Sequence, residues 1–260
     1  MVKKGISRFY MALMFLFLYA PIIVLIVFSF NSEKTTAHWT GFTFDWYRQL
    51  FHDRQIMKAL YYTVSIAVLA SVISTIVGTF AAMGLYKMKR KPRKFWLTAN
   101  NLPILNPDIV TGIAIMILFK SIKMEFGYLT LLLSHITFDI PFVIISVLPR
   151  LRQMPKSMVE AALDLGATPM YALRKIVLPE IKPGIITGFL IAFTMSIDDF
   201  VISFFTTGKG VTNLSIVIYS MAKRGINPKI NALSALMFIV VLLLLLIISF
   251  RDTKVKRVNK

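Results

Sequence analysis

The chain has 260 residues, of which 57% are hydrophobic and 16% are charged. This composition is too apolar for an ordinary soluble domain, and several apolar stretches reach the roughly 20 residues that a helix needs to cross a bilayer. The absence of cysteine excludes disulfide bonds and thiolate chemistry. The sequence therefore predicts an all-α membrane protein that crosses the bilayer several times.

Six apolar stretches predict six transmembrane helices. In chain order they cover residues 9–30, 60–86, 95–119, 127–148, 185–207 and 230–250. The first stretch follows basic residues, as a signal peptide does, but its length of about 20 residues exceeds the 7–15 of a signal segment, and no A-x-A cleavage site follows. We therefore expect a retained first helix and a single membrane domain over residues 1–260.

The distribution of Lys and Arg predicts the orientation of the chain. If both termini lie inside, the inner segments hold 20 of the 30 basic residues. The densest cluster places six of them within residues 87–94. Because cytoplasmic loops carry an excess of Lys and Arg, we expect both termini in the cytoplasm, and the net charge of +18 requires no nucleic-acid partner.

The inner loop 150–184 has the features of an amphipathic helical hairpin. Pro155 is typical of a helix start and Gly166 of a helix end, and a second short helix is expected over residues 170–177. One apolar face of the first helix has the helical spacing i, i+3, i+4, i+7 and consists of Met158, Ala161, Ala162 and Leu165. Amphipathicity alone leaves two interpretations open, a helix on the lipid interface and a helix that enters the groove of a partner.

The residues of this loop resemble the EAA motif of permease subunits of ABC importers. The matching positions are Glu160, Ala161, Ala162, Gly166, Ile176, Leu178 and Pro179. Segments 29–32, 134–138 and 196–199 are among those that extend the resemblance over nearly the whole chain, to the spermidine/putrescine permeases. The resemblance implies the six-helix, MetI-like fold of type I ABC importer permeases, with a cytoplasmic coupling helix that docks on an ATPase.

The same resemblance implies the partners of the chain. It would be a multi-pass protein of the bacterial inner membrane and form a heterodimer with a second, homologous permease. An ABC ATPase dimer would drive it, and a periplasmic or lipid-anchored polyamine-binding protein would deliver the substrate. The chain lacks the phosphate-binding sequence G-x-x-x-x-G-K-[ST]. We therefore expect no enzyme activity, cofactor or metal on this chain, with ATP and magnesium bound by the partner ATPase.

Carboxylates within the predicted spans indicate the class of substrate. Charged side chains inside a bilayer are costly and by default mark a pathway, and no Lys or Arg lies well inside a span to neutralise them. The four carboxylates are Asp108, Asp139, Asp198 and Asp199. They favour a cationic substrate such as a polyamine. The alternatives are an ABC permease for another cation or a metal, and a self-sufficient cation channel or carrier, which would have no ATPase to dock.

Two of these aspartates also have a structural interpretation. Asp108 follows Asn106 and Pro107, which predict a broken helix, and its carboxylate caps the second half-helix, contacts the substrate or does both. Asp139 lies one turn after His135, so we expect a direct hydrogen bond between them inside the bundle in preference to a second cation site.

Asp198 and Asp199 are adjacent, so on a helix their side chains point about 100° apart. We expect one to line the pathway and the other to bond a neighbouring helix, and the family resemblance favours Asp198 as the substrate ligand. Trp46, in the outer loop, offers either a cation–π face for an ammonium group or an anchor at the membrane interface.

Two stripes of small residues predict helix packing, because small residues let helix backbones approach closely. One stripe lies on the second span and consists of Ala67, Ser71, Ser74, Gly78 and Ala82. The other is the GxxxG sequence from Gly184 to Gly188, at the start of the fifth span.

Overall fold

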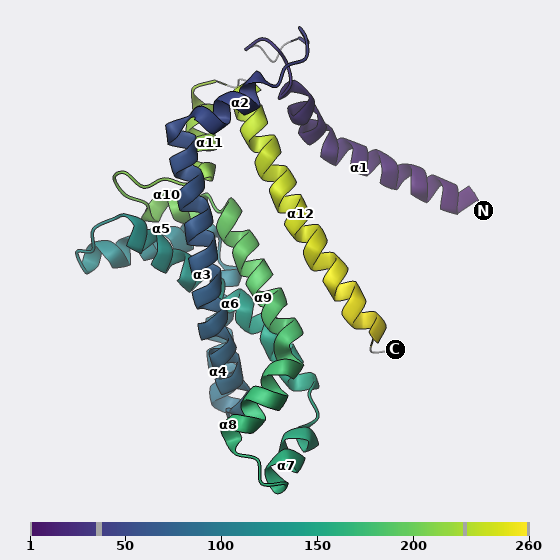
Figure 1. Cartoon of the computed structure of the whole chain (residues 1–260), viewed down its shortest axis with the longest axis vertical. Coiled ribbons are helices and arrows are strands. Elements are labelled where there is room, and N and C mark those ends of the chain that lie inside the picture. Colours follow the sequence, from purple (N-terminus) through teal and green to yellow (C-terminus); the bar gives the residue numbers. More distant parts are fainter. Residues whose placement is uncertain (1, 35–37, 226–227, 259–260) are drawn as a thin grey trace. The chain divides into compact units, whose positions relative to one another are not determined.

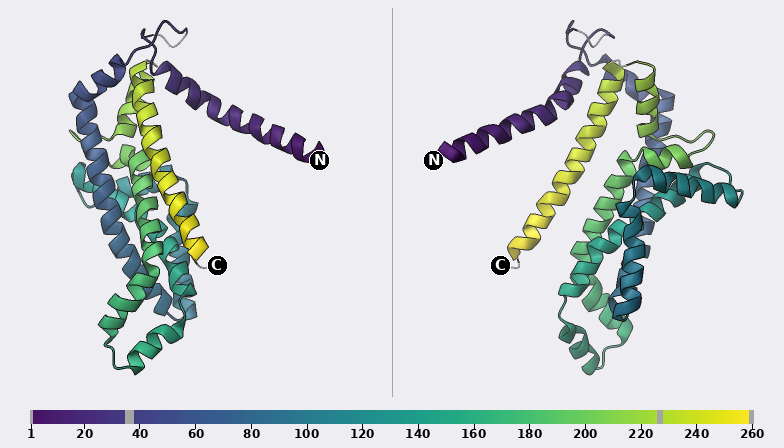
Figure 2. Two further views of the ribbon diagram at one scale, coloured as in Figure 1. Left: turned by 45° about the vertical axis from the view of Figure 1, so that its right-hand side comes forward. Right: turned by 180° about the vertical axis from the view of Figure 1, so that it is seen from behind.

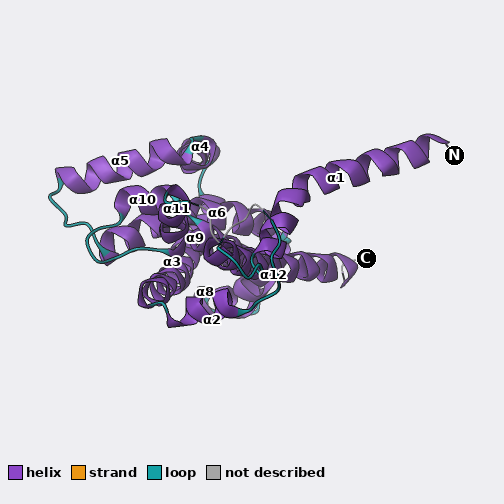
Figure 3. Cartoon of the chain, turned by 90° about the horizontal axis from the view of Figure 1, so that it is seen from above, coloured by secondary structure: helices purple, strands orange, loops and turns teal. Residues whose placement is uncertain are grey.

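A computed structural model of the chain describes residues 2–34, 38–225 and 228–258 (Figure 1). Its elements are α1 (Val2–Phe28), α2 (Asp45–His52), α3 (Arg54–Lys87), α4 (Arg90–Leu105), α5 (Asp108–Ser121), α6 (Tyr128–Gln153), α7 (Lys156–Asp164), α8 (Pro169–Ala172), a π-helical turn (Leu173–Val177), α9 (Leu178–Asp198), α10 (Val201–Thr206), α11 (Leu214–Lys223) and α12 (Pro228–Val258). Figure 3 shows helices and loops only in the described part of the chain, which confirms the predicted all-α class.

The predicted spans correspond to long apolar helices. Among the described residues, five helices are long and apolar enough to cross a membrane, and the number is six if one bent pair of helices counts as a single span. That pair is α4 and α5, which meet at 107°. Pro107 lacks a backbone N–H and forces Asn106 into an extended conformation, with φ −79° and ψ 146°. The break predicted in the third span is confirmed.

The fifth span differs from the predicted range of 185–207 at both ends. One apolar helical run extends from Pro169 to Asp198, so the short helix expected at 170–177 is continuous with the span. Pro179 cannot donate a backbone hydrogen bond, and the wider π-helical turn precedes it. At the other end the helix stops at Asp198 and resumes as α10 at Val201. The prediction of one continuous helix through this point is wrong.

The chain divides into two compact units. The first unit comprises Met1–Lys58 and Leu214–Leu242, and the second comprises Ala59–Asn213 and Leu243–Lys260. The boundaries fall within α3, at the start of α11 and within α12. The organisation of residues 1–260 as one membrane domain stays a prediction.

Helix α6 packs against both α3 and α9 in the second unit (Figure 2). A Cβ atom added to Gly78 of α3 would lie 2.8 Å from the Cβ of Val143, and one added to Gly188 of α9 would lie 3.2 Å from the Cα of the same residue. The buried aliphatic core around this contact consists of Ala82, Leu85, Val143, Ile144, Val147, Leu148, Leu151, Ile181 and Ala192. Both predicted stripes of small residues are buried in helix contacts, as expected.

We expect Gly184→Ala to destabilise the protein by about 1–3 kcal/mol. The new Cβ would lie 2.8 Å from the Cγ of Arg150 and 2.9 Å from the carbonyl oxygen of Ser146. Gly84→Ala is the matched control, because a Cβ there meets nothing within 4 Å. Thermal unfolding of both variants in detergent checks this, and equal stability of the two would contradict the packing assignment.

Asn31 organises the loop of the first unit that follows α1. Its Oδ1 accepts hydrogen bonds from the backbone N–H and the hydroxyl of Thr40, at 2.8 and 2.9 Å, and its Nδ2 donates to the carbonyl of His38 at 3.1 Å. The indole N–H of Trp46 donates to the backbone carbonyl of Asn31 at 2.6 Å. The loop is therefore held by polar side chains, and Trp46 is part of that structure.

An ion pair joins the α2–α3 junction to the start of α12, within the first unit. Nζ of Lys229 lies 2.5 Å from Oδ2 of Asp53. Oδ1 of Asp53 accepts the backbone N–H groups of Gln55 and Ile56, at 2.9 and 3.3 Å, and so caps α3. The hydrogen bond from Lys229 is the main cause that holds the pKa of Asp53 below its usual range; partial burial opposes it and the backbone donors add to it.

Because the pKa of Asp53 is lowered by folding, the pair stabilises the fold above the ordinary carboxyl pKa of about 4, and this contribution disappears as the pH falls through the folded value. We expect Asp53→Asn to cost up to about 1 kcal/mol at neutral pH. Lys229→Met removes the same pair from its other side and is the control. Thermal unfolding from pH 7 to pH 3 measures the effect. A difference between wild type and variant that stays constant across this range would contradict it.

Candidate functional site

The cytoplasmic hairpin expected from the sequence begins with α7 and turns at Gly166. The N–H of Gly166 donates to the carbonyl of Leu163 at 2.9 Å, and the N–H of Ala167 donates to the carbonyl of Ala162 at 3.0 Å. This pair of bonds is the Schellman pattern that ends a helix. The pattern requires a positive φ at the first residue beyond the helix, which here is Gly166. Gly166 has φ +84°. The helix end predicted at Gly166 is confirmed.

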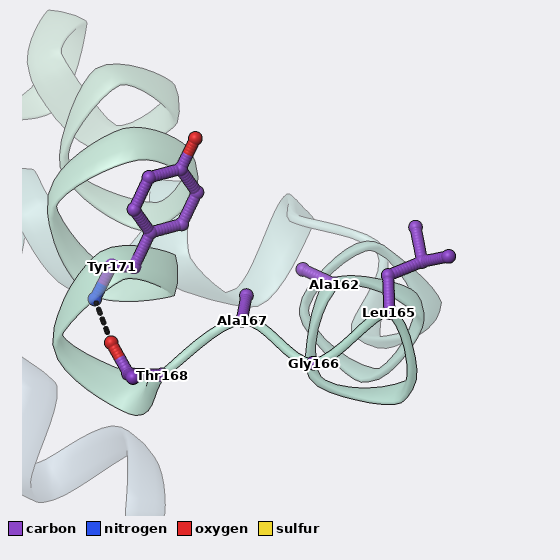
Figure 4. Close-up of a pocket in the computed structure, with 6 residues that line it drawn as sticks. All are labelled: Ala162, Leu165, Gly166, Ala167, Thr168 and Tyr171. Carbon is purple, nitrogen blue, oxygen red and sulfur yellow. Dashed lines mark hydrogen bonds between the residues drawn. The ribbon is translucent and has the colours of Figure 1, made fainter.

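An open apolar depression of about 490 Å³ lies at this turn (Figure 4). Its lining residues are Ala162, Leu165, Gly166, Ala167, Thr168 and Tyr171. Leu165 is 88% exposed, and the hydroxyl of Thr168 accepts the N–H of Tyr171 at 3.3 Å and so caps α8. Exposed apolar surface of this kind is typical of sites where another protein docks.

The motif residues of the hairpin separate into three groups. Ala162 and Gly166 line the depression, while Glu160 and Ala161 are exposed on α7 beside it. Ile176 belongs to the π-helical turn, and Leu178 and Pro179 begin α9 directly after it. Leu178 packs against the aliphatic core of the second unit and anchors the hairpin to the span.

A second candidate site is a buried polar cluster centred on His135, a residue of α6. Its Nδ1 lies 3.0 Å from Oγ of Ser196 in α9, and its Nε2 lies 3.0 Å from Oγ of Ser203 in α10. The hydroxyl of Ser196 donates to Oδ2 of Asp139 at 2.8 Å. His135 is 2% exposed and Asp139 is 0% exposed, so the cluster is enclosed by the second unit.

The prediction of a direct hydrogen bond between His135 and Asp139 is wrong. Ser196 lies between them and bonds to both side chains. The reason is that α9 packs on this face of α6, so a hydroxyl from a neighbouring helix reaches both groups. Oδ1 of Asp139 has no hydrogen-bond partner in the described part of the protein.

The structure assigns different surroundings to the two adjacent aspartates. The carboxylate of Asp199 accepts the backbone N–H groups of Ile202 and Ser203, at 3.2 and 2.7 Å, and lies 3.6 Å from Nε2 of His135. Its side chain is 9% exposed, whereas Asp198 is exposed. Asp199 therefore closes the first turn of α10, and Asp198 is the more accessible of the pair.

Asp108 is the exposed first residue of α5. Pro107 occupies the N-cap position, and no side-chain hydrogen bond caps the helix. The capping role considered for Asp108 is therefore wrong, because the rigid proline occupies the capping position. Helix α5 packs against α10, since a Cβ on Gly112 would lie 3.0 Å from Cδ2 of Phe205. The half-helices that follow the two breaks thus contact each other.

Trp46 differs from the aspartates because it is buried, with 8% of its surface exposed. Its N–H is bonded to the backbone, as described above, so the interface anchor considered for it does not describe this conformation. A cation–π contact to a substrate stays a prediction. Within the described ranges, no group of three or more His, Asp or Glu residues is placed to hold a metal ion.

Sequence reasoning missed two members of the cluster around His135. Ser203 belongs to a small polar stripe that includes Ser196 and Asp199, but that stripe gave no sign of a partner on another helix. Asn213 donates through Nδ2 to the backbone carbonyl of Asp199 at 2.9 Å and to Oγ of Ser203 at 2.7 Å. It comes from the loop before α11, where no local pattern marked it.

Comparison with known proteins assigns this architecture to a family. Residues 74–259 match the family described as binding-protein-dependent transport system inner membrane component. The chain belongs to this family, and it is therefore a permease component of an ABC importer and not a catalytic subunit.

Individual relatives are similar over most of the chain. The spermidine/putrescine transport system permease protein PotC of Escherichia coli K12 is 37% identical over 246 residues, which cover 95% of this chain and 93% of PotC. The putrescine transport system permease protein PotI of the same organism is 40% identical over 232 residues, which cover 85% and 82%. PotC of Haemophilus influenzae is 36% identical over 246 residues, which cover 93% and 96%.

Solved structures share the fold at lower identity. A chain of a bacterial importer of the polysaccharide alginate superposes with a TM-score of 0.70 at 21% identity, over 100% of this chain and 99% of that one. A chain of the MetNI methionine transporter gives a TM-score of 0.63 at 20% identity, over 80% and 100%. The fold is accordingly that of ABC importer permeases.

Proposed function

We propose that the chain forms half of the translocation pathway of an ATP-driven importer of polyamines such as spermidine and putrescine. A second, homologous permease forms the other half. The names of the relatives support the cargo, because PotC is a spermidine/putrescine permease and PotI a putrescine permease. The protein is a multi-pass component of the bacterial inner membrane with both termini in the cytoplasm, as the basic inner segments indicate.

The observation that carries the proposal is the position of two exposed carboxylates at the breaks of otherwise apolar spans. Asp108 begins α5, and Asp198 ends α9 just before α10. Because α5 and α10 pack together, both breaks belong to one region of the second unit. Carboxylates in a medium of low dielectric constant attract the ammonium groups of a polyamine strongly.

The aspartates contribute in different ways. Asp198 and Asp108 contact the cation. Asp199 attracts it only through its charge, because its oxygens are bonded to the backbone of α10. Asp139 is fully buried and bonds Ser196, so any contribution to the pathway is electrostatic. Trp46 offers its ring to the substrate only after the outer loop rearranges.

The apolar depression at Gly166 is the docking surface for one subunit of an ABC ATPase dimer, which binds ATP and magnesium. Other exposed apolar surface needs a cover as well. The apolar part of α1, Ser7–Phe28, has no residue buried within the chain, so lipid and the second permease cover it. A periplasmic or lipid-anchored binding protein delivers the polyamine on the opposite side.

Helix continuity links the docking surface to the carboxylates. The run from Pro169 to Asp198 begins at the depression and ends at the break, and a helix of 30 residues spans about 45 Å. ATP binding closes the ATPase dimer and draws the two coupling hairpins together. The attached helices then move as rigid bodies, open the cavity outward to receive the substrate, and return after hydrolysis.

We expect Asp198→Asn to lower the uptake of radiolabelled putrescine and spermidine about tenfold or more at subsaturating concentration, because the substrate loses a charged partner. The complex of both permeases, the ATPase and the binding protein, reconstituted in liposomes, provides the measurement. Asp45→Asn, an exposed carboxylate at the start of α2, is the control. Wild-type uptake by Asp198→Asn would remove this residue from the pathway. Absence of polyamine uptake by the wild-type complex, with transport of another cation, would contradict the cargo.

We expect Gly166→Asp to abolish uptake and co-purification of the ATPase while membrane insertion is retained. The substitution adds a charge at the depression and strains a residue with positive φ, at a cost of about 1 kcal/mol or more. Gly210→Asp is a close control, because Gly210 has φ +82° and equally open surroundings but lies in another loop. Normal ATPase binding by Gly166→Asp would show that the hairpin is not the docking site.

A further inference from the structure

The break between α9 and α10 lacks the residues that usually interrupt a helix. Residues 196–203 read Ser-Ile-Asp-Asp-Phe-Val-Ile-Ser, with neither proline nor glycine. Sharp helix interruptions normally come from such residues or from side chains inserted into the hydrogen-bond ladder. The geometry of this break must therefore be held by contacts with the rest of the second unit.

His135 makes contacts on both sides of the break. One ring nitrogen bonds Ser196, in the last turn of α9, and the other bonds Ser203, in the first turn of α10, each at 3.0 Å. On a continuous helix, residues seven apart are separated by roughly 10 Å along the axis. An imidazole with two hydrogen bonds of ordinary length spans roughly 8 Å. The interruption brings the two hydroxyls within reach of one ring.

For a neutral imidazole, proton counting gives one consistent direction for each bond in this cluster. A serine hydroxyl has one proton, and that of Ser196 is donated to Asp139, so Ser196 accepts from Nδ1–H of His135. Ser203 accepts from Asn213, which leaves its own proton for Nε2. One chain of hydrogen bonds therefore runs from Asn213 to Asp139 through a neutral imidazole. Both ring nitrogens of His135 then have a hydrogen-bond partner, and the ring needs no positive charge.

We propose that His135 is a positioning residue for the transport pathway: its imidazole holds the break in the geometry that turns Asp198 outward and Asp199 inward. The carboxylate of Asp199, 3.6 Å from Nε2, is kept against α10 by the same arrangement. Asp198 is exposed as a consequence. The transport consequence rests on the proposed function, whereas the effect on the geometry of the break does not.

The first test compares substitutions of His135 in the reconstituted complex. His135→Phe keeps a ring but removes both bonds, His135→Asn retains a donor near the Nδ1 position, and His135→Gln retains one near Nε2. We expect His135→Phe to raise the KM for putrescine and spermidine about tenfold, with Vmax changed less than about twofold. The Asn and Gln variants should recover part of the loss. His52→Phe, at an exposed histidine of α2, is the control.

A KM for His135→Phe equal to that of the wild type overturns the proposal. If Vmax or assembly falls while the KM is unchanged, the role of His135 is purely structural. If His135→Phe does not fold, Ser203→Ala replaces it, because it keeps the imidazole and its bond to Ser196 and removes only the bonds of Ser203 to His135 and Asn213. Its KM is then expected to rise about threefold, and an unchanged KM overturns the proposal.

The second test needs no polyamine and uses the absence of cysteine from the chain. Asp198→Cys supplies the only thiol, and a cationic methanethiosulfonate reagent measures its accessibility. We expect the labelling rate to fall about tenfold when His135→Phe is added, and an equal rate in both backgrounds overturns the proposal. If the wild-type complex transports no polyamine, the proposed cargo fails while this labelling result still decides the role of His135.

Discussion

Satisfaction of polar groups inside the bilayer is the constraint on which the rest of this structure depends. Where a span is interrupted, no water is present in the hydrocarbon to bond the freed backbone groups. At the break after Asp198, the carboxylate of Asp199 accepts two of the freed N–H groups. The side chain of Asn213 donates to the backbone carbonyl of Asp199. At the break after Leu105, proline removes a donor outright. The two interruptions thus use different chemistry for one requirement.

The acidic residues at the interruptions differ in what their carboxylates do. A carboxylate that satisfies the backbone is held in place, and its neighbour at the end of the helix is exposed. Asp199 and Asp198 take these two roles in adjacent positions. One carboxylate is thereby exposed while the adjacent one satisfies the backbone. The same helical run carries this arrangement at one end and the hairpin that turns at Gly166 at the other.

Much of the fold was predictable because its signals are local. Apolar length defined the spans, Asn106-Pro107 located one break, and the hairpin sequence placed Gly166 at a helix end. The second break was not predictable, because Asp199 carries both a capping signal and the signal of a charge within a span. The bond expected from His135 to Asp139 was wrong because Ser196 arrives from another helix. Asn213 joins the cluster through tertiary contact alone, and no spacing in the sequence encodes such a contact.

The π-helical turn Leu173–Val177 has a further consequence for the hairpin. Such a turn contains one residue more than an α-helical turn, and each residue of an α-helix rotates the next by about 100°. Addition or removal of one residue here therefore swings the apolar depression around the axis of α9 without changing its composition. The chain length between Gly166 and Pro179 therefore sets the direction in which the apolar depression faces, and a deletion there that keeps every lining residue would still turn the depression to another side of α9.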